Sequence, residues 1–123
     1  MSLIYPDESY KIVGICMDVH NNLGPGFSEI VYKDALELEF SKAGINYQRE
    51  KEYEVLYKGI VLPHKFYADF VVYDKIVLEV KGKKELCDED IAQCINYLKV
   101  SENSLALLVN FGEPKLNSRR IVL

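Results

Sequence analysis

Apolar residues recur at helical spacing near the start of the chain, and glycines mark where the periodic stretches stop. In residues 8–22, Ile12 and Val19 fall on one face of a helix with 3.6 residues per turn. A glycine-proline-glycine run at residues 24–26 predicts a tight turn. A second helix is predicted over residues 28–42, ended by a glycine.

From residue 45 the pattern changes to the alternation that is typical of strands. Residues 53–57 alternate between apolar and polar side chains, and the Lys-Gly pair at residues 58–59 predicts a two-residue hairpin turn. A proline and a histidine at residues 63–64 are expected to interrupt the returning arm. Strands are then predicted over residues 66–73 and 76–81, joined by a short turn.

The last third of the chain predicts one more helix and a buried strand. Residues 86–99 carry apolar side chains at helical spacing, and residues 104–111 are almost wholly apolar. The tail is expected to add a short strand at residues 121–123. The order α-α-β-β-β-α-β predicts an α/β fold with a mixed central sheet flanked by helices. The 123 residues suit one domain spanning residues 1–123.

The net charge of the chain limits how it could bind nucleic acid. With 15 Lys and Arg against 19 Asp and Glu, the formal net charge is −4. Proteins that hold nucleic acid through their overall field are usually basic, so such a contact would need a local patch, a metal ion or a second subunit. Two clusters of basic residues are candidates, with ordinary solvated side chains as the alternative: Lys81, Lys83 and Lys84, and Arg119 with Arg120.

The sequence predicts a cytoplasmic protein. The first ten residues lack the basic start and apolar core of a secretory signal, and no apolar run approaches the roughly 18 residues of a membrane span. Three cysteines, Cys16, Cys87 and Cys94, form no CxxC pair. We expect them to be small buried hydrophobic side chains, because a redox pair or a zinc site needs closer spacing or more histidines.

Charged residues stand on the inward faces of two predicted strands. Alternation places Asp69 on the same face as Tyr67 and Val71, and places Glu79 with Lys81 on one face of the next strand. If these strands are neighbours, two carboxylates and a lysine converge. Taken singly, each has an ordinary alternative, such as a strand-end hydrogen-bond acceptor or an exposed ion pair of little energetic value.

The helices add further polar groups to the same side. Glu29 heads the stripe of the second helix that continues through Tyr32 and Leu36, although an acid near a helix start also complements the helix dipole. Gln93 and Tyr97 lie one turn apart on the third helix, where a simple hydrogen bond and packing are the alternative. Carboxylate and amide oxygens of this kind suit Mg²⁺ or Mn²⁺ better than zinc.

These motifs resemble a known family. The run Gly26-Phe27-Ser28-Glu29-Ile30-Val31-Tyr32 resembles the signature of the GxxExxY proteins, which are assigned to the PD-(D/E)XK nuclease superfamily. Asp69 followed by Glu79-Val80-Lys81 resembles the acidic motif of that superfamily, with Ala68 in place of its proline. The helix run from Gln93 to Tyr97 is similar to a QxxxY motif, and residues 105–112 resemble the final core strand. The resemblance implies a restriction-endonuclease-like core.

The resemblance also implies a metal-dependent phosphodiesterase site. Asp69, Glu79 and the Val80 carbonyl would hold Mg²⁺ or Mn²⁺, and Glu29 would join them directly or through water. Lys81 would orient the attacking water and offset charge in the transition state. Four further residues complete the expected site: Gln93 to position Lys81 or the phosphate, Tyr97 to support that helix face and the bound substrate, and Lys83 with Lys84 to contact nucleic acid.

Three functions remain open from the sequence alone. The first is a Mg²⁺-dependent nuclease acting on DNA or RNA, with a homodimer expected because a second subunit would enlarge the binding surface. The second is a binding module that keeps the site without catalysis and recognises a nucleotide, nucleic acid or protein. The third, a purely structural subunit, is disfavoured because a cluster of charges without a ligand would cost folding free energy.

Overall fold

The computed structural model describes residues 3–123, which form two helices, three strands, a helix and two strands in that order. The sequence predicted all of these, except that the last strand is twice as long as expected. The bounds are α1 (Pro6–Leu23), α2 (Glu29–Lys42), β1 (Tyr47–Tyr57), β2 (Ile60–Val72), β3 (Ile76–Lys81), α3 (Asp88–Ser101), β4 (Leu105–Asn110) and β5 (Asn117–Val122).

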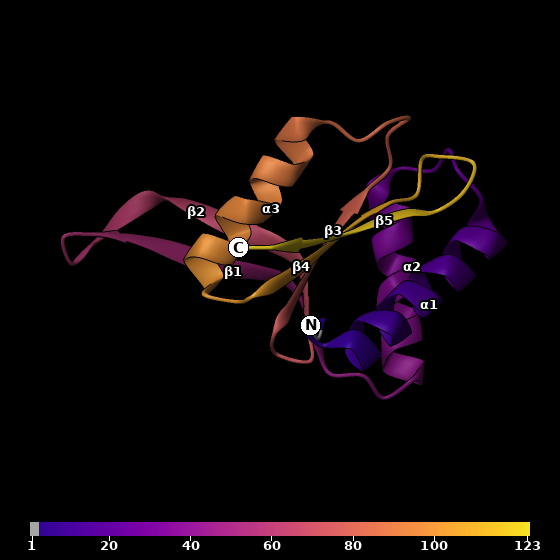
Figure 1. The fold of residues 1–123 in the computed structure, drawn as a ribbon, viewed down its shortest axis with the longest axis horizontal. Helices are drawn as coiled ribbons and strands as arrows, with labels where there is room; N and C mark the ends of the chain where they lie inside the picture. Colours follow the sequence, from indigo (N-terminus) through magenta and orange to yellow (C-terminus); the bar gives the residue numbers. More distant parts are fainter. Residues whose placement is uncertain (1–2) are drawn as a thin grey trace.

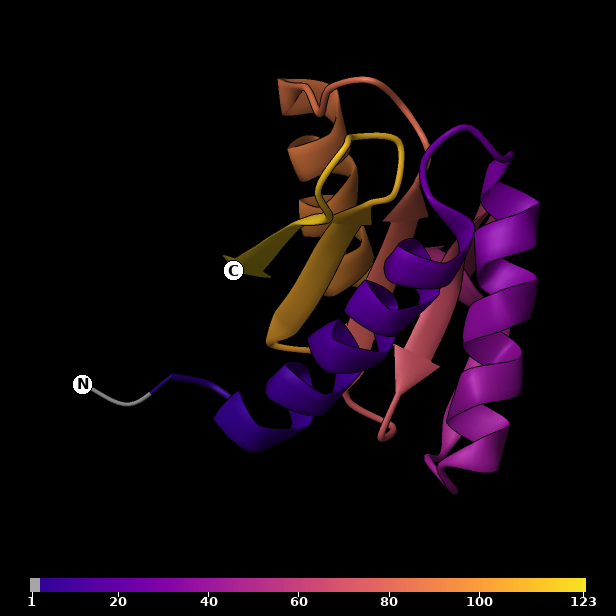
Figure 2. The ribbon, with the colours of Figure 1, turned by 90° about the vertical axis from the view of Figure 1, so that its right-hand side faces the viewer.

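The strands form one mixed sheet with the order β1-β2-β3-β4-β5. Strands β3 and β4 are parallel, joined by α3, and the other neighbouring pairs are antiparallel. Helices α1 and α2 cover one face of the sheet and α3 covers the other (Figures 1 and 2). The predicted α/β fold with a helix-flanked mixed sheet is confirmed.

Each face of the sheet has its own hydrophobic core. On the α1–α2 face, Tyr32 and Phe40 pack with β-strand side chains such as Phe70 and Leu78. On the α3 face, Leu98 and its neighbours pack with another set of side chains from the same strands. Strands β3 and β4 are buried on both sides, which explains why their sequences are nearly continuous apolar runs.

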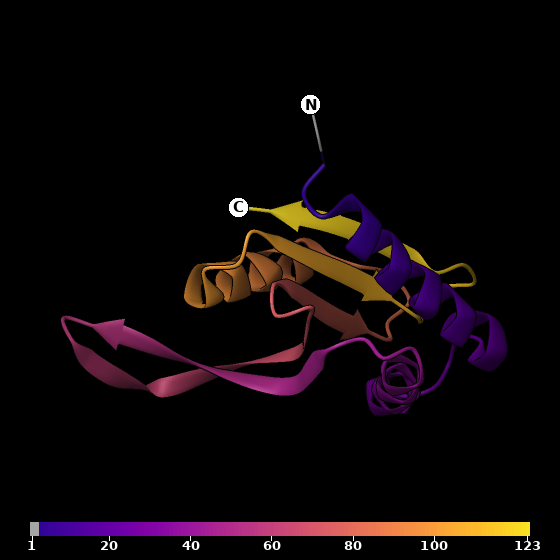
Figure 3. The ribbon, with the colours of Figure 1, turned by 90° about the horizontal axis from the view of Figure 1, so that it is seen from below.

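The β1–β2 hairpin extends beyond the helices as a long arm (Figures 1 and 3). The predicted interruption at residues 63–64 is confirmed in part: β2 runs through them as one strand, but its pairing with β1 is irregular there. The proline is accommodated by a register shift: Glu54 pairs with Lys65, whereas Leu56 pairs with Val61. An irregularity of this kind lets a strand carry a residue that cannot donate to the ladder.

Strict alternation in β2 fails at Asp69. The sequence predicted that Ala68 and Phe70 share one face, but Ala68 packs in the α3-side core and Phe70 in the α1–α2-side core. The partner strand is distorted at the same level, where Glu50 adopts a left-handed backbone with φ 54°. A local twist of both strands therefore turns Asp69 away from the regular pleat.

Two further features complete the fold. None of the helices within residues 3–123 is both long and apolar enough to cross a bilayer. Cys16 and Cys94 are buried as expected, and burial raises the pKa of each thiol to about 12. The prediction for Cys87 is wrong, because this residue is exposed at the start of α3, where a helix terminus faces solvent.

Candidate active site

Strands β2 and β3 separate at Asp69 and Glu79, and their side chains take over the hydrogen bonds there. Regular pairing is found from Val72–Ile76 to Phe70–Leu78. Beyond it, the Asp69 amide donates to Glu79 Oε1 at 3.1 Å, and the Val80 amide donates to Asp69 Oδ2 at 2.8 Å. Each carboxylate thus binds the backbone of the other strand, which fixes the positions of both acids. We call this point, where β2 and β3 separate at Asp69 and Glu79, the strand fork, or the fork.

Glu79 is a buried carboxyl beside another acid. It is 2% exposed. Burial first, and then the negative charge of Asp69, raise the pKa of Glu79 well above its usual value, while Lys81 opposes the shift only weakly. Such a group binds a proton or a cation more readily than a solvated carboxylate does.

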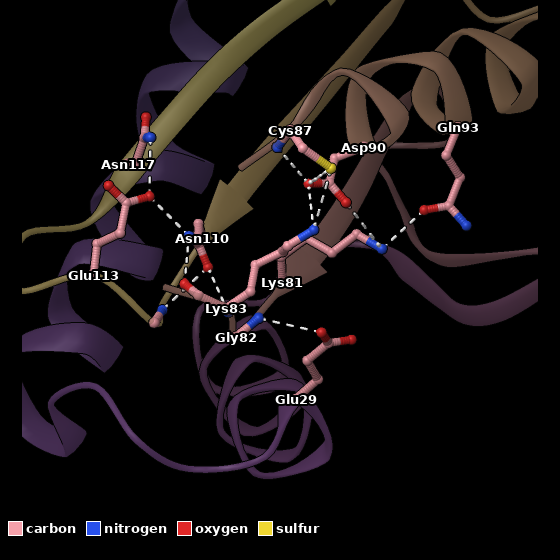
Figure 4. A network of polar contacts seen from close by, with 11 residues as sticks. Glu29, Lys81, Gly82, Lys83, Cys87, Asp90, Gln93, Asn110, Glu113 and Asn117 are labelled. Carbon is pink, nitrogen blue, oxygen red and sulfur yellow. Dashed lines mark hydrogen bonds and ion pairs between the residues drawn. The ribbon is translucent and has the colours of Figure 1, made fainter. Parts of the chain in front are cut away.

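Lys81 leaves the end of β3 and points to α3 (Figure 4). Its Nζ donates to Gln93 Oε1 at 2.8 Å and lies 3.9 Å from Asp90 Oδ1. The contact between Lys81 and Gln93 is one of the two that the family resemblance implied for Gln93. The Lys81 side chain is 18% exposed, so it is not closed off from solvent.

The other two lysines of the predicted basic cluster differ from each other. Lys83 Nζ donates to Asp90 Oδ2 at 2.8 Å, and Asp90 also accepts the Cys87 amide at 2.8 Å. Lys83 therefore ties the loop after β3 to the first turn of α3, while Lys84 is exposed. The pKa of Asp90 is lowered by its hydrogen bonds with Lys83 and Cys87, which outweigh an opposing effect of burial.

A buried amide that the sequence interpretation missed holds the same loop. Asn110 is fully buried; its side chain accepts from the Lys83 amide at 3.0 Å and donates to the Lys83 carbonyl at 2.8 Å. Close by, a Cβ on Gly112 would lie 2.3 Å from the Lys83 oxygen. The signal in the sequence is one amide within the otherwise apolar run of β4.

Glu29 reaches the site from the start of α2. Its Oε2 accepts from the Gly82 amide at 3.2 Å, directly after Lys81 (Figure 4). The expectation that Glu29 lies on the buried side is wrong, since the residue is exposed. In residues 3–123, no three His, Cys, Asp or Glu side chains are gathered closely enough to hold a metal ion, so Glu29 does not form a ready-made triad with Asp69 and Glu79.

Tyr97 is part of the core beneath the site. It is buried, and its ring packs edge-on against Phe66 with centroids 5.9 Å apart. Burial, together with the charges of Glu79 and Asp69, raises the pKa of its hydroxyl. The structure thus gives Tyr97 a packing contact, while substrate binding by its hydroxyl stays a prediction.

Lys33, which the sequence interpretation also missed, contacts Asp69. Lys33 Nζ lies 3.0 Å from Asp69 Oδ1 and also pairs with Glu50. The side chain of Lys33 is 13% exposed. Its two ion pairs overcome the effect of burial and raise the pKa of Lys33, so the ammonium stays charged. Its only signal in the sequence is its position one helical turn after Glu29.

The donor set at the fork fits a hard divalent cation. Mg²⁺ is commonly bound by one or two carboxylates and keeps several waters, so the absence of a third gathered acid in residues 3–123 does not count against it. A cation would also relieve the repulsion that raises the pKa of Glu79. Asp69, Glu79 and the main chain of Val80 are the groups that would hold such an ion.

Two solved structures share the fold of this chain. The crystal structure of SSO0001 resembles 76% of the chain with a TM-score of 0.60 and 23% identity, and the chain covers 50% of that protein's length. An alkaline exonuclease (LHK-Exo) from Laribacter hongkongensis resembles 99% of the chain with a TM-score of 0.54 and 12% identity, over 72% of its own length. At these identities the likeness shows the fold alone.

Sequence comparison identifies the superfamily. No curated protein matches the chain. The sequence profile of the PD-(D/E)XK nuclease superfamily, however, matches residues 6–121, which reach from the start of α1 into β5. The chain therefore belongs to the PD-(D/E)XK nuclease superfamily.

Proposed function

We propose that the protein is a divalent-metal-dependent nuclease that hydrolyses phosphodiester bonds of DNA or RNA. The observation that carries this proposal is the fork at which Asp69 and Glu79 hold each other's strands, with Lys81 two residues further on. Superfamily membership supports it independently. Within the superfamily, the run from Gly26 to Tyr32 favours the GxxExxY proteins as the family.

The site divides into groups that would hold the metal and groups that would act on the substrate. Asp69, Glu79 and the Val80 carbonyl would hold Mg²⁺ or Mn²⁺, with Glu29 bound through a water. When bound, the ion would polarise the phosphate and make a coordinated water more acidic.

The Lys81 ammonium would orient the attacking water and offset charge that develops on the phosphate. Its partner Gln93 holds that ammonium in place. Lys84, which is exposed, and Lys83 would contact the nucleic-acid backbone, where each lysine acts as a local positive charge on an acidic protein. Tyr97 would support the substrate side of α3.

The nuclease proposal is tested by incubating the pure protein with labelled single- and double-stranded DNA and RNA, with Mg²⁺ or with EDTA. We expect cleavage in Mg²⁺ alone, and a loss of at least about 100-fold in the Lys81→Met variant. Lys99→Met, an exposed lysine on α3, serves as the matched control and should cleave like the wild type. Equal cleavage by the wild type and Lys81→Met would rule out this site.

A binding module without catalysis is the second candidate. It is favoured by the net charge of −4, because proteins that hold nucleic acid through their overall field are usually basic. Calorimetry distinguishes the two functions. Binding of Mn²⁺ without cleavage of any polymer supports the binding module, whereas efficient cleavage removes it.

We also propose that the protein is cytoplasmic and that each chain folds as a single domain. Two copies of this domain would associate as a homodimer. The surface that supports pairing is the tip of the β1–β2 arm. Leu56, Tyr57, Ile60 and Val61 are all exposed there, and residues 55–68 contain no Asp or Glu. Apolar side chains clustered on an exposed tip are typical of an interface.

A further inference from the structure

We propose that Lys33 is an internal competitor for the divalent cation at Asp69, so that the chain itself limits the affinity of its metal site. This inference rests on the proposed function, because it concerns the same site. It gives a role to a residue that none of the expected site motifs includes.

The position of the Lys33 ammonium is the first support. Of the two Asp69 oxygens, Oδ2 accepts the Val80 amide, and Oδ1 is the one that Lys33 Nζ contacts at 3.0 Å. The oxygen not used by the strand fork is therefore the oxygen that Lys33 covers. A cation bound at that oxygen would lie beside the Lys33 ammonium, and two positive charges this close repel each other.

Glu50 is the second support, because it gives Lys33 another partner. The Glu50 carboxylate pairs with Lys33 and is 49% exposed, whereas Lys33 is 13% exposed. Glu50 takes this position through a left-handed backbone with φ 54°, a conformation that is costly for a residue with a Cβ. Lys33 can thus leave Asp69 and keep an ion pair at the edge of the sheet.

The same contact stabilises the protein without metal. Asp69 lies beside the buried carboxyl of Glu79, and the Lys33 ammonium offsets part of that negative charge. Removing the charge of Lys33 therefore has two effects of opposite sign. The metal-free protein becomes less stable, and the metal binds more tightly.

The test is an equilibrium titration with Mn²⁺ alone, followed by electron paramagnetic resonance of the free ion, with melting temperatures recorded in EDTA. Lys33→Met removes the charge, and Lys33→Gln removes it while keeping a polar side chain in case the first variant folds poorly. We expect both variants to bind Mn²⁺ about tenfold more tightly than the wild type. Both should melt at a lower temperature in EDTA.

Lys65→Met is the matched control. Lys65 lies on β2, the strand that carries Asp69, pairs with Glu54 at 3.5 Å and is 28% exposed, but it has no ion pair with Asp69. Its replacement should leave the Mn²⁺ affinity unchanged.

The outcomes separate this inference from the proposed function. If wild type and both Lys33 variants bind Mn²⁺ with equal affinity, or the variants bind more weakly, Lys33 is not a competitor, although the metal site stands. If no protein in the series binds Mn²⁺, the metal site and the competitor role are both refuted.

Discussion

Glu79 is a carboxyl whose charged form is disfavoured by burial and by Asp69 together. Because the folded state raises its pKa above 4.5, the folded protein holds this proton more tightly than the unfolded chain does. The contribution of Glu79 to stability is therefore most favourable below pH 4.5. It declines as pH rises from 4.5 through the raised folded value.

Glu79→Gln should stabilise the metal-free protein at neutral pH. The amide oxygen can still accept the Asp69 amide, and the buried like charge is gone. The free energy of unfolding of the variant should exceed that of the wild type by about 1.4 kcal/mol for each pH unit by which folding raises the pKa of Glu79. Urea unfolding between pH 4 and pH 8 in EDTA measures it, with exposed Glu85→Gln as the control. If the variant loses stability with rising pH as steeply as the wild type, the loss does not come from Glu79, and the raised pKa of this residue is refuted.

Gln93 is expected to act through Lys81 rather than on the substrate itself. Gln93→Ala removes the acceptor that holds the Lys81 ammonium, so the turnover rate should fall by about 10- to 100-fold with little change in KM. Asn96→Ala, an exposed residue of the same helix, is the control. A change confined to KM would instead place Gln93 on the substrate.

At the scale of the elements, the loop after β3 is fixed by its contacts with β4. Gly112→Ala would put a Cβ 2.3 Å from the Lys83 oxygen and 2.5 Å from its nitrogen. Backbone must move, so we expect a loss of about 1–3 kcal/mol in the free energy of unfolding. Gly14→Ala in α1 meets nothing within 4 Å and should stabilise by about 0.5–1 kcal/mol. Chemical denaturation of both variants measures the two changes in the free energy of unfolding, which should have opposite signs.

Local patterns predict the elements well where one periodicity dominates. The predicted strand at residues 76–81 matches β3, and the helix stripe through Tyr32 and Leu36 is buried as expected. The sequence could not show how Asp69 departs from its pleat. That twist depends on the left-handed backbone at Glu50 in the neighbouring strand, and no local pattern encodes a pairing between distant segments.

In the candidate site too, the sequence predicts relations within one strand or helix but not contacts between elements. Spacing within one strand or helix predicts that Glu79 lies near Lys81, and that Gln93 faces the sheet. Contacts between elements were not predictable, as with Lys33 on Asp69 and Asn110 on the backbone of Lys83. In both cases a polar side chain reaches another part of the chain, and only the folded arrangement decides which part.

At the scale of the whole molecule, the arm is the surface on which pairing of two copies is tested. Replacing Leu56 and Ile60 together with Asp places charges at its exposed tip. Analytical ultracentrifugation should report about twice the chain mass of 14.1 kDa for the wild type and the chain mass for the variant. A wild type that sediments as a monomer at all concentrations would exclude pairing.

The central claim is that Asp69 and Glu79 together hold a divalent cation. A crystal structure of the protein soaked in Mn²⁺, with anomalous diffraction measured at the manganese edge, tests it most directly. We predict one anomalous peak within about 2.0–2.5 Å of an oxygen of each carboxylate. No peak at saturating Mn²⁺, or a peak bound to neither residue, would contradict the account.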